Sequence, residues 1–417
     1  MNEELVDILI IGAGPSGCVS ASYLKKNNVN VKIVEKEKFP RYVIGESLLP
    51  RCMDHFEEVD LLDCLKSQNY EIKRGARFLK KDIVCNFDFS QKHSEGWNWT
   101  WQIPRDDFDN VLATEVQNKG VTIDFENEVI DVSFQGTHSK TTVKDKNGNL
   151  KIIHAKFIID SSGYGRVLPR LLNLDIPSKL PDHSSIFTQV KDIKRPDGNE
   201  GTLITFDVID THVWFWVIPF SNGNTSIGFV GPTEFINSFS GSPVEMLSEM
   251  LKISTYFYNR FKDVEYLFEP KIIQNFSKSV KQLYGEGYAL TGNSSEFLDP
   301  IFSSGVTFAT ESGLLAAKLA LKEINDEVVD WEKEYTGYIA EGVNVFTSYV
   351  NEWYTGNLQK LFFHRPENQE IKKQICAVLA GYVWDKTNPF VSKHNRIIKN
   401  IAHLIDLEKD SLEIKET

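Results

Sequence analysis

The sequence predicts an α/β fold on three observations. Residues 6–11 are apolar and mostly β-branched, a glycine-rich turn follows at 12–17, and a helix then leads to a second apolar strand at 30–36. This order is that of a βαβ unit, from which parallel sheets are built. Residues 183–230 form short β-rich segments between turn residues, which is typical of an antiparallel sheet. After Gly305 the pattern is mostly helical.

A chain of 417 residues is too long for one ordinary core, so we expect several packed regions. We predict a discontinuous nucleotide-binding domain made of residues 1–75, 101–180 and 285–325. Residues 76–100 and 181–284 are expected to form an inserted, mainly antiparallel β-sheet domain, and 326–417 a C-terminal helical region. The pattern also predicts helices at 106–118 and 243–261, strands at 121–124 and 128–134, and a hairpin turn at 146–149.

Composition excludes several classes of protein. The net charge of -12 argues against a nucleic-acid partner, which would need a basic face. The five cysteines include no C-x-x-C pair, a pattern typical of reduced thiols rather than of a disulfide framework or a zinc site. No apolar run approaches the length of a membrane span, and the N-terminus lacks a basic leader. We therefore expect a cytoplasmic protein without a metal site.

The turn at 12–17 reads G-x-G-x-x-G and consists of Gly12, Ala13, Gly14, Pro15, Ser16 and Gly17. Between a buried strand and a helix, such a turn offers free backbone amides and the positive end of the helix to a diphosphate. Glu35 follows Gly17 by eighteen residues, near the interval expected of an acid that binds a ribose 2′-hydroxyl. The alternative is an ordinary glycine turn with an exposed glutamate, which this combined context disfavours.

A second segment indicates which dinucleotide binds. Gly292–Asn293, Asp299–Pro300 and Gly305–Val306 before a helix resemble the second FAD fingerprint of aromatic-hydroxylase-type flavoproteins, although the family has aspartate where Asn293 stands. Asp160–Gly163 resembles the family's middle motif. The resemblance implies a GR2-type Rossmann-like FAD-binding domain without a separate NAD(P)H domain. It assigns to FAD, beside the first glycine turn and Glu35, the residues Lys36, Arg41, Ser47, Arg105, Val129, Asp160, Gly163, Asn293, Asp299, Pro300, Gly305 and Val306.

Four segments further resemble flavin-dependent halogenases, over roughly residues 1–320. Residues 214–219 read W-x-W-x-I-P, 297–305 read F-x-x-P-x-x-S-x-G, and 39–50 read F-P-R-x-x-x-G-E-S-x-x-P. In the fourth segment, 73–78, Lys73 stands where the family keeps its catalytic lysine. The resemblance assigns the substrate tunnel to Trp214, Trp216, Pro219, Phe297, Phe302, Ser303 and Ser304.

The halogenase resemblance implies a reaction. In that family, FAD that a separate reductase has reduced reacts with oxygen, a halide ion is oxidised to hypohalous acid, and the acid passes through a tunnel to the lysine beside an electron-rich aromatic ring. The tryptophan-specific branch carries a glutamate after the proline near the flavin, but residues 301–304 contain no acid and Glu311 is the next one. The implied substrate is therefore a phenol or pyrrole, free or carrier-bound, rather than free tryptophan.

Each of these residues also has a simpler interpretation. Trp214 and Trp216 lie two apart on a strand and are candidates for the core as well as for a tunnel wall. Lys73 stands in a stretch rich in Lys and Arg, which would suit a solvated basic face. Ser304 is a candidate helix N-cap as well as part of a halide or flavin site. Ser47, with Glu46 before it, is a candidate capping residue as well as a flavin contact.

Two other functions stay open from the sequence. One is a flavin hydroxylase, or a dehydrogenase or reductase of an apolar substrate. The other is a flavin-binding protein without catalysis.

Overall fold

The computed structural model describes residues 2–178, 180–364 and 368–416. The predicted α/β class is confirmed. The chain forms two compact units. The first consists of Met1–Asn69, Ile103–Lys179 and Lys278–Ala340, and the second of Tyr70–Gln102, Leu180–Ser277 and Glu341–Thr417. The finer division into three regions, with 326–417 by itself, stays a prediction.

The first unit is built on a sheet whose strand order is β18-β19-β10-β1-β2-β7. Its central members pair in parallel, and Ile8, Leu9 and Ile10 of β1 are completely buried. A parallel strand covered on both faces needs such a continuous apolar run, so the predicted βαβ unit is confirmed. The strands are β1 (Asn2–Ile11), β2 (Val31–Val34), β7 (Thr122–Asp124), β10 (Leu150–Asp160), β18 (Tyr284–Gly285) and β19 (Tyr288–Leu290).

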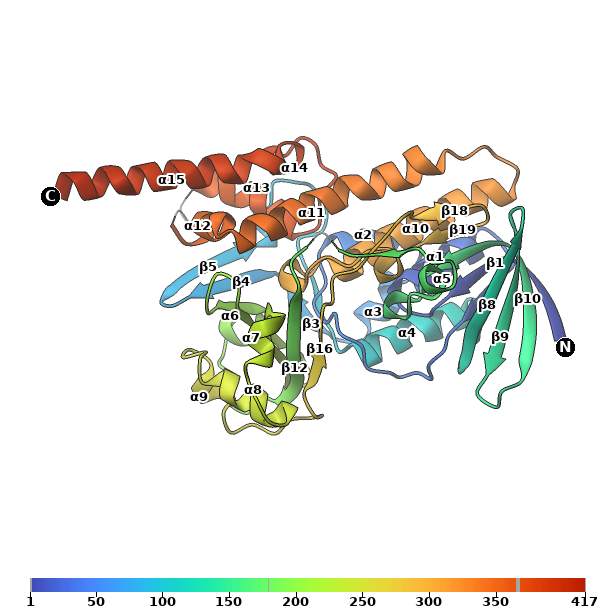
Figure 1. The fold of residues 1–417 in the computed structure, drawn as a ribbon, viewed down its shortest axis with the longest axis horizontal. Helices are drawn as coiled ribbons and strands as arrows, with labels where there is room; N and C mark the ends of the chain where they lie inside the picture. The colour runs from blue at the N-terminus through green and yellow to red at the C-terminus, as the bar shows by residue number, and fades with distance from the viewer. Residues whose placement is uncertain (1, 179, 365–367, 417) are drawn as a thin grey trace. The chain divides into compact units, whose positions relative to one another are not determined.

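Two further strands extend this sheet. β8 (Asn127–Gln135) and β9 (His138–Asp145) pair antiparallel with each other, and β9 continues onto β10, so the three lie side by side (Figure 1). The predicted turn at 146–149 joins β9 to β10, where the Asp145 carboxylate accepts hydrogen bonds from the N–H groups of Asn147 and Asn149.

Helices of the first unit pack on this sheet. α1 (Pro15–Lys26) crosses α10 (Gly305–Ile324) at Gly313, where a Cβ atom would lie 2.6 Å from Ser16 Oγ. Only glycine allows the two helices to approach so closely. The other helices are α2 (Arg51–Glu58), α3 (Leu62–Lys66), α4 (Arg105–Asn118) and α5 (Val167–Leu171), with short turns η2 (Gly163–Gly165), η3 (Gly292–Ser294), η4 (Pro300–Phe302) and the π-helix η5 (Glu332–Gly337).

The second unit contains a seven-stranded sheet in the order β16-β12-β15-β14-β13-β4-β5. Its pairs are antiparallel except β13 with β4, so the predicted mainly antiparallel sheet is confirmed. Every residue of β14 is buried, and both faces of the sheet are covered. The strands are β4 (Gly75–Lys80), β5 (Ile83–Asp88), β12 (His183–Lys191), β13 (Thr205–Val208), β14 (Trp214–Pro219), β15 (Asn224–Pro232) and β16 (Lys271–Ile273).

One face of this sheet packs against short helices. Phe215, Val217 and Phe229 form a core with α8 (Pro243–Leu251) and α9 (Tyr258–Phe261). The single helix predicted at 243–261 is wrong, because the chain leaves the helix after Leu251 and buries Ser254, whose hydroxyl donates a 2.6 Å hydrogen bond to Asp207. Two more short helices belong here, α6 (Asn199–Thr202) and α7 (Thr233–Asn237).

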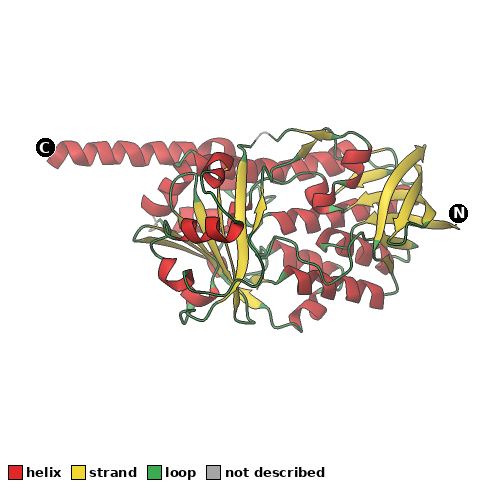
Figure 2. Cartoon of the chain, turned by 60° about the horizontal axis from the view of Figure 1, so that its bottom comes forward, coloured by secondary structure: helices red, strands yellow, loops and turns green. Residues whose placement is uncertain are grey.

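Aromatic side chains cover the opposite face of the seven-stranded sheet. Phe78 stacks on Phe206 and also contacts Trp353 and Phe362 of the C-terminal helices. The predicted C-terminal helices are present, and Figure 2 shows α15 as one long helix ending at the C-terminus. They are α11 (Tyr338–Tyr354), α12 (Asn357–His364), α13 (Gln369–Leu379), α14 (Pro389–Ser392) and α15 (His394–Glu416).

A two-stranded ribbon completes the second unit. β3 (Glu71–Lys73) pairs antiparallel with β6 (Thr100–Gln102), and the turn η1 (Phe89–Gln91) lies between them in the sequence. In the first unit, β11 (Asp175–Ile176) pairs with β17 (Ser279–Val280). None of the described helices is both long and apolar enough to cross a bilayer.

Candidate active site

The glycine turn at 12–17 has the geometry that a diphosphate site needs. Gly12 has a φ of +101°, and a Cβ there would lie 2.5 Å from Ser161 O. A Cβ on Gly17 would lie 2.0 Å from Gly12 O, so this glycine lets strand and helix pack closely. A Cβ on Gly14 would meet only Arg41 Nη2, at 3.8 Å. A side chain at Gly14 would therefore not clash inside the turn. It would instead fill the space beside the turn that a diphosphate would occupy.

Glu35 follows directly after β2 and points at the glycine turn. Its carboxylate accepts hydrogen bonds from the N–H of Ala13 at 2.8 Å and from the N–H of Glu37 at 2.8 Å. The side chain is buried, which contradicts the alternative of an exposed glutamate. Lys36 beside it is exposed and pairs with Glu128 at 3.0 Å. A carboxylate at this position is ready to accept hydrogen bonds from ribose hydroxyls.

Two arginines share one buried carboxylate near this turn. Asp109, which is completely buried on α4, binds Arg41 at 2.8 Å and Arg105 through two hydrogen bonds of 2.9 and 3.0 Å. The buried Asp109 beside it raises the pKa of Arg105 despite the burial of that guanidinium, which by itself lowers it. A single carboxylate thus holds both guanidinium groups close together, and arginine is well suited to bind phosphate.

Three hydroxyl groups connect the glycine turn to two distant loops. Ser16, Ser161 and Thr291 form a closed set of hydrogen bonds of 2.7, 3.2 and 2.9 Å. Asp160 precedes Ser161, and its carboxylate accepts from the N–H groups of Ser162 and Leu168. Burial raises the pKa of Asp160. Its side chain thus orders the loop that contains Gly163, which has a φ of +57°.

The segment around Asn293 packs against the loop that follows Asp160, within the first unit. The ring of Tyr164, on the loop after Asp160, packs 5.7 Å from that of Phe297, on the segment after Asn293. Arg166 donates to the carbonyl oxygen of Asn293 at 2.9 Å and fixes this loop. A Cβ on Gly305 would touch Phe297 at 3.4 Å. Although 40% of Tyr164 is exposed, desolvation of its hydroxyl raises its pKa to about 12.

The loop at 39–50 meets the start of α10. A Cβ on Gly45 would lie 2.8 Å from Arg105 Nη1 and 3.8 Å from Val306 Cγ2. Arg105 also donates to the carbonyl oxygens of Ile44 and Gly45. The loop is thus held beside α4 and α10. Ser47 on this loop is buried, and so is Val129, which belongs to the apolar core of the unit.

α10 begins with an unusual backbone turn. Asp299 accepts a 2.9 Å hydrogen bond from the N–H of Ile301 and so orders the short turn that starts at Pro300. Ser303 then adopts a left-handed conformation with a φ of +56°, which is costly for a residue with a side chain. Ser304 is the N-cap, but its side chain accepts no capping hydrogen bond from the first turn of the helix. The first amides of α10 therefore stay available to an anion. Phe302, on the turn before the helix, is buried.

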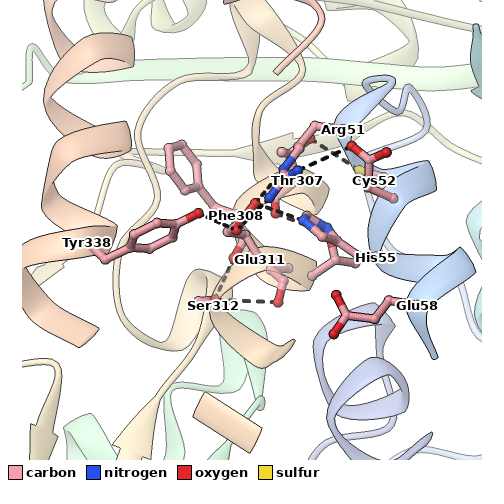
Figure 3. A network of polar contacts seen from close by, with 12 residues as sticks. Arg51, Cys52, His55, Glu58, Thr307, Phe308, Glu311, Ser312 and Tyr338 are labelled. Carbon is pink, nitrogen blue, oxygen red and sulfur yellow. Dashed lines mark hydrogen bonds and ion pairs between the residues drawn. The ribbon is translucent and has the colours of Figure 1, made fainter. Parts of the chain in front are cut away.

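Glu311 lies at the centre of a polar network behind this helix start (Figure 3). Its carboxylate accepts from Arg51 at 2.9 and 3.1 Å, from His55 at 2.8 Å and from Tyr338 at 2.8 Å. Although burial raises the pKa of Glu311, the hydrogen bonds and charges of His55 and Arg51 outweigh it and hold the pKa far below its ordinary value. Because its acceptor positions are used, Glu311 is a structural ion-pair partner that links α2, α10 and the start of α11.

Lys73, in the second unit, is not on a solvated face. Only 1% of the residue is exposed, and its ammonium lies 5.6 Å from the centre of the Phe89 ring. On β3 it stands directly opposite Thr100 of β6. Arg74, the next residue, is exposed. A buried lysine is rare in proteins and commonly marks a functional or paired site.

Trp214 and Trp216 are both buried on β14, with 1% and 5% exposed. Trp214 donates a hydrogen bond to the hydroxyl of Tyr354 at 3.2 Å, and Trp216 donates to Ser226 at 3.0 Å. A Cβ on Gly228, which faces Trp216 across the strands, would lie 2.5 Å from its ring. Both indoles are therefore fixed in one orientation by the residues around them.

Gln102 connects the strand of Trp214 to the ribbon of Lys73. Its amide donates to the carbonyl oxygens of Pro219 and Thr202 and accepts from the N–H of Ile204. Gln102 is diagonal to Lys73 on the same face of the ribbon. Within the second unit, the ribbon and the end of β14 are thus held together by one side chain.

Residues 5–229, more than half of the chain, match the model of a family described as FAD binding domain. This chain belongs to the FAD binding domain family. It is an FAD-dependent oxidoreductase, and its relatives include flavin-dependent halogenases. The resemblance drawn from the motifs is thereby confirmed at the level of the family.

Three relatives show how far the similarity extends. A crystal structure of a flavoprotein/dehydrogenase from Cytophaga hutchinsonii is 50% identical, covers 97% of this chain and 100% of its own, and has a TM-score of 0.96. A 1H-pyrrole-2-carbonyl peptidyl-carrier protein chlorinase of Pseudomonas fluorescens is 26% identical over 92% of this chain and 91% of its own length. The structure of the flavin-dependent brominase Bmp2 shares the fold, with 23% identity, a TM-score of 0.84, and 97% of this chain and 100% of its own covered.

The first unit of this flavoprotein fits FAD. Open space at Gly14, a buried carboxylate at Glu35 and two arginines held together by Asp109 are features that suit a ribose and a diphosphate. All predicted cofactor residues lie in this unit, together with Phe297, Phe302, Ser303 and Ser304. Lys73, Trp214, Trp216 and Pro219 lie in the second unit.

Two residues of these sites escaped prediction from the sequence. Asp109 stands four residues after Arg105 on α4, a spacing that brings side chains together on a helix and could have indicated the pair. Gln102 gives no such indication, because its three partners come from distant parts of the chain.

Proposed function

We propose that this flavoprotein uses reduced FAD and oxygen to halogenate an electron-rich aromatic compound. The observation that carries the proposal is the burial of Lys73, which is 1% exposed in the unit that also contains the W-x-W-x-I-P strand. A lysine is almost never fully buried unless it is paired or functional, so this position is selected for more than solubility. A reactive lysine that receives hypohalous acid is the role that the family resemblance assigns to this position.

When bound, reduced FAD would supply the two electrons that activate oxygen, and the resulting oxidant would take two electrons from halide to give hypohalous acid. The chain's own residues bind the cofactor and the halide and orient the reacting acid. Gly12–Gly17, Arg41 and Arg105 hold the FAD diphosphate, and the first amides of α10 hold the halide or a flavin carbonyl. The Lys73 ammonium donates a hydrogen bond to the oxygen of hypohalous acid and makes that oxygen a better leaving group.

Halogen transfer joins the halogen to a ring carbon and releases water. A π electron pair of the aromatic ring forms the bond from carbon to halogen while the bond from halogen to oxygen breaks. The oxygen leaves as hydroxide and takes a proton from Lys73, which gives water. The ring carbon then loses its own proton, which returns to the Lys73 amine.

The substrate we propose is a phenol or a pyrrole, free or bound to a carrier protein. The similarity to a chlorinase whose name specifies a pyrrole on a peptidyl-carrier protein supports this class. Glu311, the first acid after the 297–305 motif, already binds Arg51, His55 and Tyr338. It therefore has no acceptor left to orient an indole N–H.

A separate flavin reductase is the partner that this function requires. The sequence has no second G-x-G-x-x-G turn after a strand, so NAD(P)H is expected to reduce FAD on another protein. We propose that both proteins meet in the cytoplasm.

A dehydrogenase is the second candidate. It is favoured by the Cytophaga hutchinsonii structure, which is described as a flavoprotein/dehydrogenase and is 50% identical over its whole length. A dehydrogenase would not need halide, and its purified FAD would be reduced directly by its substrate.

The deciding experiment gives the FAD-loaded protein reduced FAD, oxygen and either chloride or bromide, with a panel of phenols and pyrroles read by mass spectrometry. Halogenated product that requires the halide supports the proposal. Hydroxylated product, or NAD(P)H consumption by the protein alone, contradicts it and favours a monooxygenase. Anaerobic bleaching of bound FAD by an apolar substrate would instead favour the dehydrogenase.

A further inference from the structure

Thr100 is a buried hydroxyl beside Lys73 that the halogenase resemblance does not assign. The residue is completely buried, and its Oγ1 has no hydrogen-bond partner among the described residues. A buried hydroxyl without a partner is costly, and native proteins retain few of them. The side chain is therefore a candidate for binding a ligand.

The position of Thr100 indicates which ligand. In the antiparallel ribbon of β3 and β6, Thr100 is the direct partner of Lys73. Directly opposite residues of an antiparallel pair project from the same face, with Cβ atoms roughly 4.5–5.5 Å apart. The Phe89 ring lies 5.6 Å from the Lys73 ammonium and provides an apolar wall. An ammonium donor and a hydroxyl thus lie beside each other on one buried face of the ribbon, next to an aromatic ring.

We propose that Thr100 is a second catalytic residue, which holds hypohalous acid together with Lys73. The inference rests on the proposed function. The acid has one oxygen that can accept from the Lys73 ammonium and one O–H that can donate to Thr100 Oγ1. Two hydrogen bonds fix the direction of the halogen, whereas one lets it rotate. A fixed halogen reacts with one position of the ring and does not escape into water.

A second orphan hydroxyl in the chain provides a matched control. Thr141 on β9 is also completely buried, and its Oγ1 has no partner among the described residues. Its partners across the strands are Ile153 and Val132, so no charged group stands opposite. Thr141 belongs to the first unit, where the proposed function assigns it no role.

The test uses Thr100→Val, which keeps the shape of the side chain and removes only the hydroxyl. We expect its Tm to equal or exceed that of the wild type, as for Thr141→Val, because an unpaired buried oxygen is lost. With reduced FAD, oxygen and bromide, product on the aromatic substrate should fall at least tenfold. Bromination of added monochlorodimedone, which traps free hypobromous acid, should rise. Thr100→Ser should restore the product.

Two results would overturn the role of Thr100. A Tm of Thr100→Val several degrees below that of Thr141→Val would show that the hydroxyl has a structural partner. Wild-type product formation by Thr100→Val, in a protein that halogenates, would show that the hydroxyl does not touch the reacting acid. Failure of the wild type itself to oxidise halide would instead overturn the proposed function, and with it this role.

Discussion

Gln102 donates a hydrogen bond of 2.5 Å to the carbonyl oxygen of Pro219. This contact joins the last residue of the W-x-W-x-I-P strand to the ribbon on which Lys73 stands. Gln102 and Pro219 are 117 residues apart in the sequence, and the side chain of Gln102 is completely buried. The two motifs that the halogenase resemblance assigns to the substrate are therefore rigidly connected within the second unit.

Lys73→Met should abolish halogenation and leave FAD bound. Methionine fills most of the buried space but cannot donate a hydrogen bond to hypohalous acid. We expect product to fall at least a hundredfold, about 3 kcal/mol in the barrier, while the absorbance of bound flavin stays constant. Lys80→Met is the matched control, since Lys80 is half-buried in the same unit and binds Gln359 at 2.9 Å. Full activity of Lys73→Met would remove Lys73 from the mechanism.

Gly14→Val should prevent FAD binding without unfolding the protein. A Cβ at Gly14 would meet only Arg41 Nη2, at 3.8 Å, so a side chain is tolerated until a diphosphate must approach. We expect colourless protein with a Tm near that of the flavin-free wild type. Gly17→Ala should behave in the opposite way, because its Cβ would lie 2.0 Å from Gly12 O. That overpacking should cost roughly 1–3 kcal/mol of stability. A yellow Gly14→Val protein with normal FAD affinity would contradict the diphosphate site.

Glu311→Gln should weaken both folding and FAD binding. The amide offers one acceptor oxygen to Arg51, His55 and Tyr338, so a buried cation loses its partner, which typically costs about 3–5 kcal/mol. Since the network links α2 to α10, and the loops before both helices belong to the cofactor site, the Kd for FAD should rise.

Asp192→Asn is the control that separates a loss of stability from a loss of FAD binding. The side chain of Asp192 is completely buried in the second unit and binds Arg260 and Thr225. Loss of this carboxylate should lower the free energy of unfolding measured in urea but leave the Kd for FAD unchanged. Equal FAD affinity in Glu311→Gln and the wild type would reduce Glu311 to a stabilising role.

The stability of the second unit should fall as the pH drops from about 6.5 to about 4. Burial lowers the pKa of His183 to about 4 from its ordinary value of 6.5. The unfolded chain therefore takes up a proton in this window before the folded protein does, and stability is lost as the pH falls. The full effect is roughly 3 kcal/mol.

His183→Asn isolates this contribution. Asparagine can still donate to the carbonyl oxygen of Pro181, which His183 contacts at 3.3 Å, but it does not titrate. Urea unfolding at pH 7, 6, 5 and 4.5 should give a smaller decline for the variant than for the wild type. Parallel curves would show that His183 does not contribute to the acid sensitivity.

Local patterns predicted the glycine turn and the elements around it, because the physics of that turn is local. The glycine turn needs only a strand before it and a helix after it, and β1, α1 and β2 supply them. The break between α8 and α9 was not predictable in this way. The apolar spacing of 243–261 favours one helix, but Ser254 hydrogen-bonds Asp207, a residue 47 positions earlier. A tertiary contact overrides the helical pattern there.

The remaining features depend on which distant residues meet. Nothing near Gly228 in the sequence shows that it lies against the ring of Trp216. The four donors that saturate Glu311 come from two other helices, α2 and α11. The burial of Lys73 could not be predicted either, because the neighbouring lysines and arginines suggest an exposed face. Such juxtapositions follow from strand register and helix packing rather than from composition.

The hydroxyls of Ser16, Ser161 and Thr291 are hydrogen-bonded to one another, although each belongs to a different part of the first unit. Side chains therefore tie the start of α1 to the segments that follow β10 and β19. Because each hydroxyl holds the other two, a change in any one of the three segments is felt by both of the others.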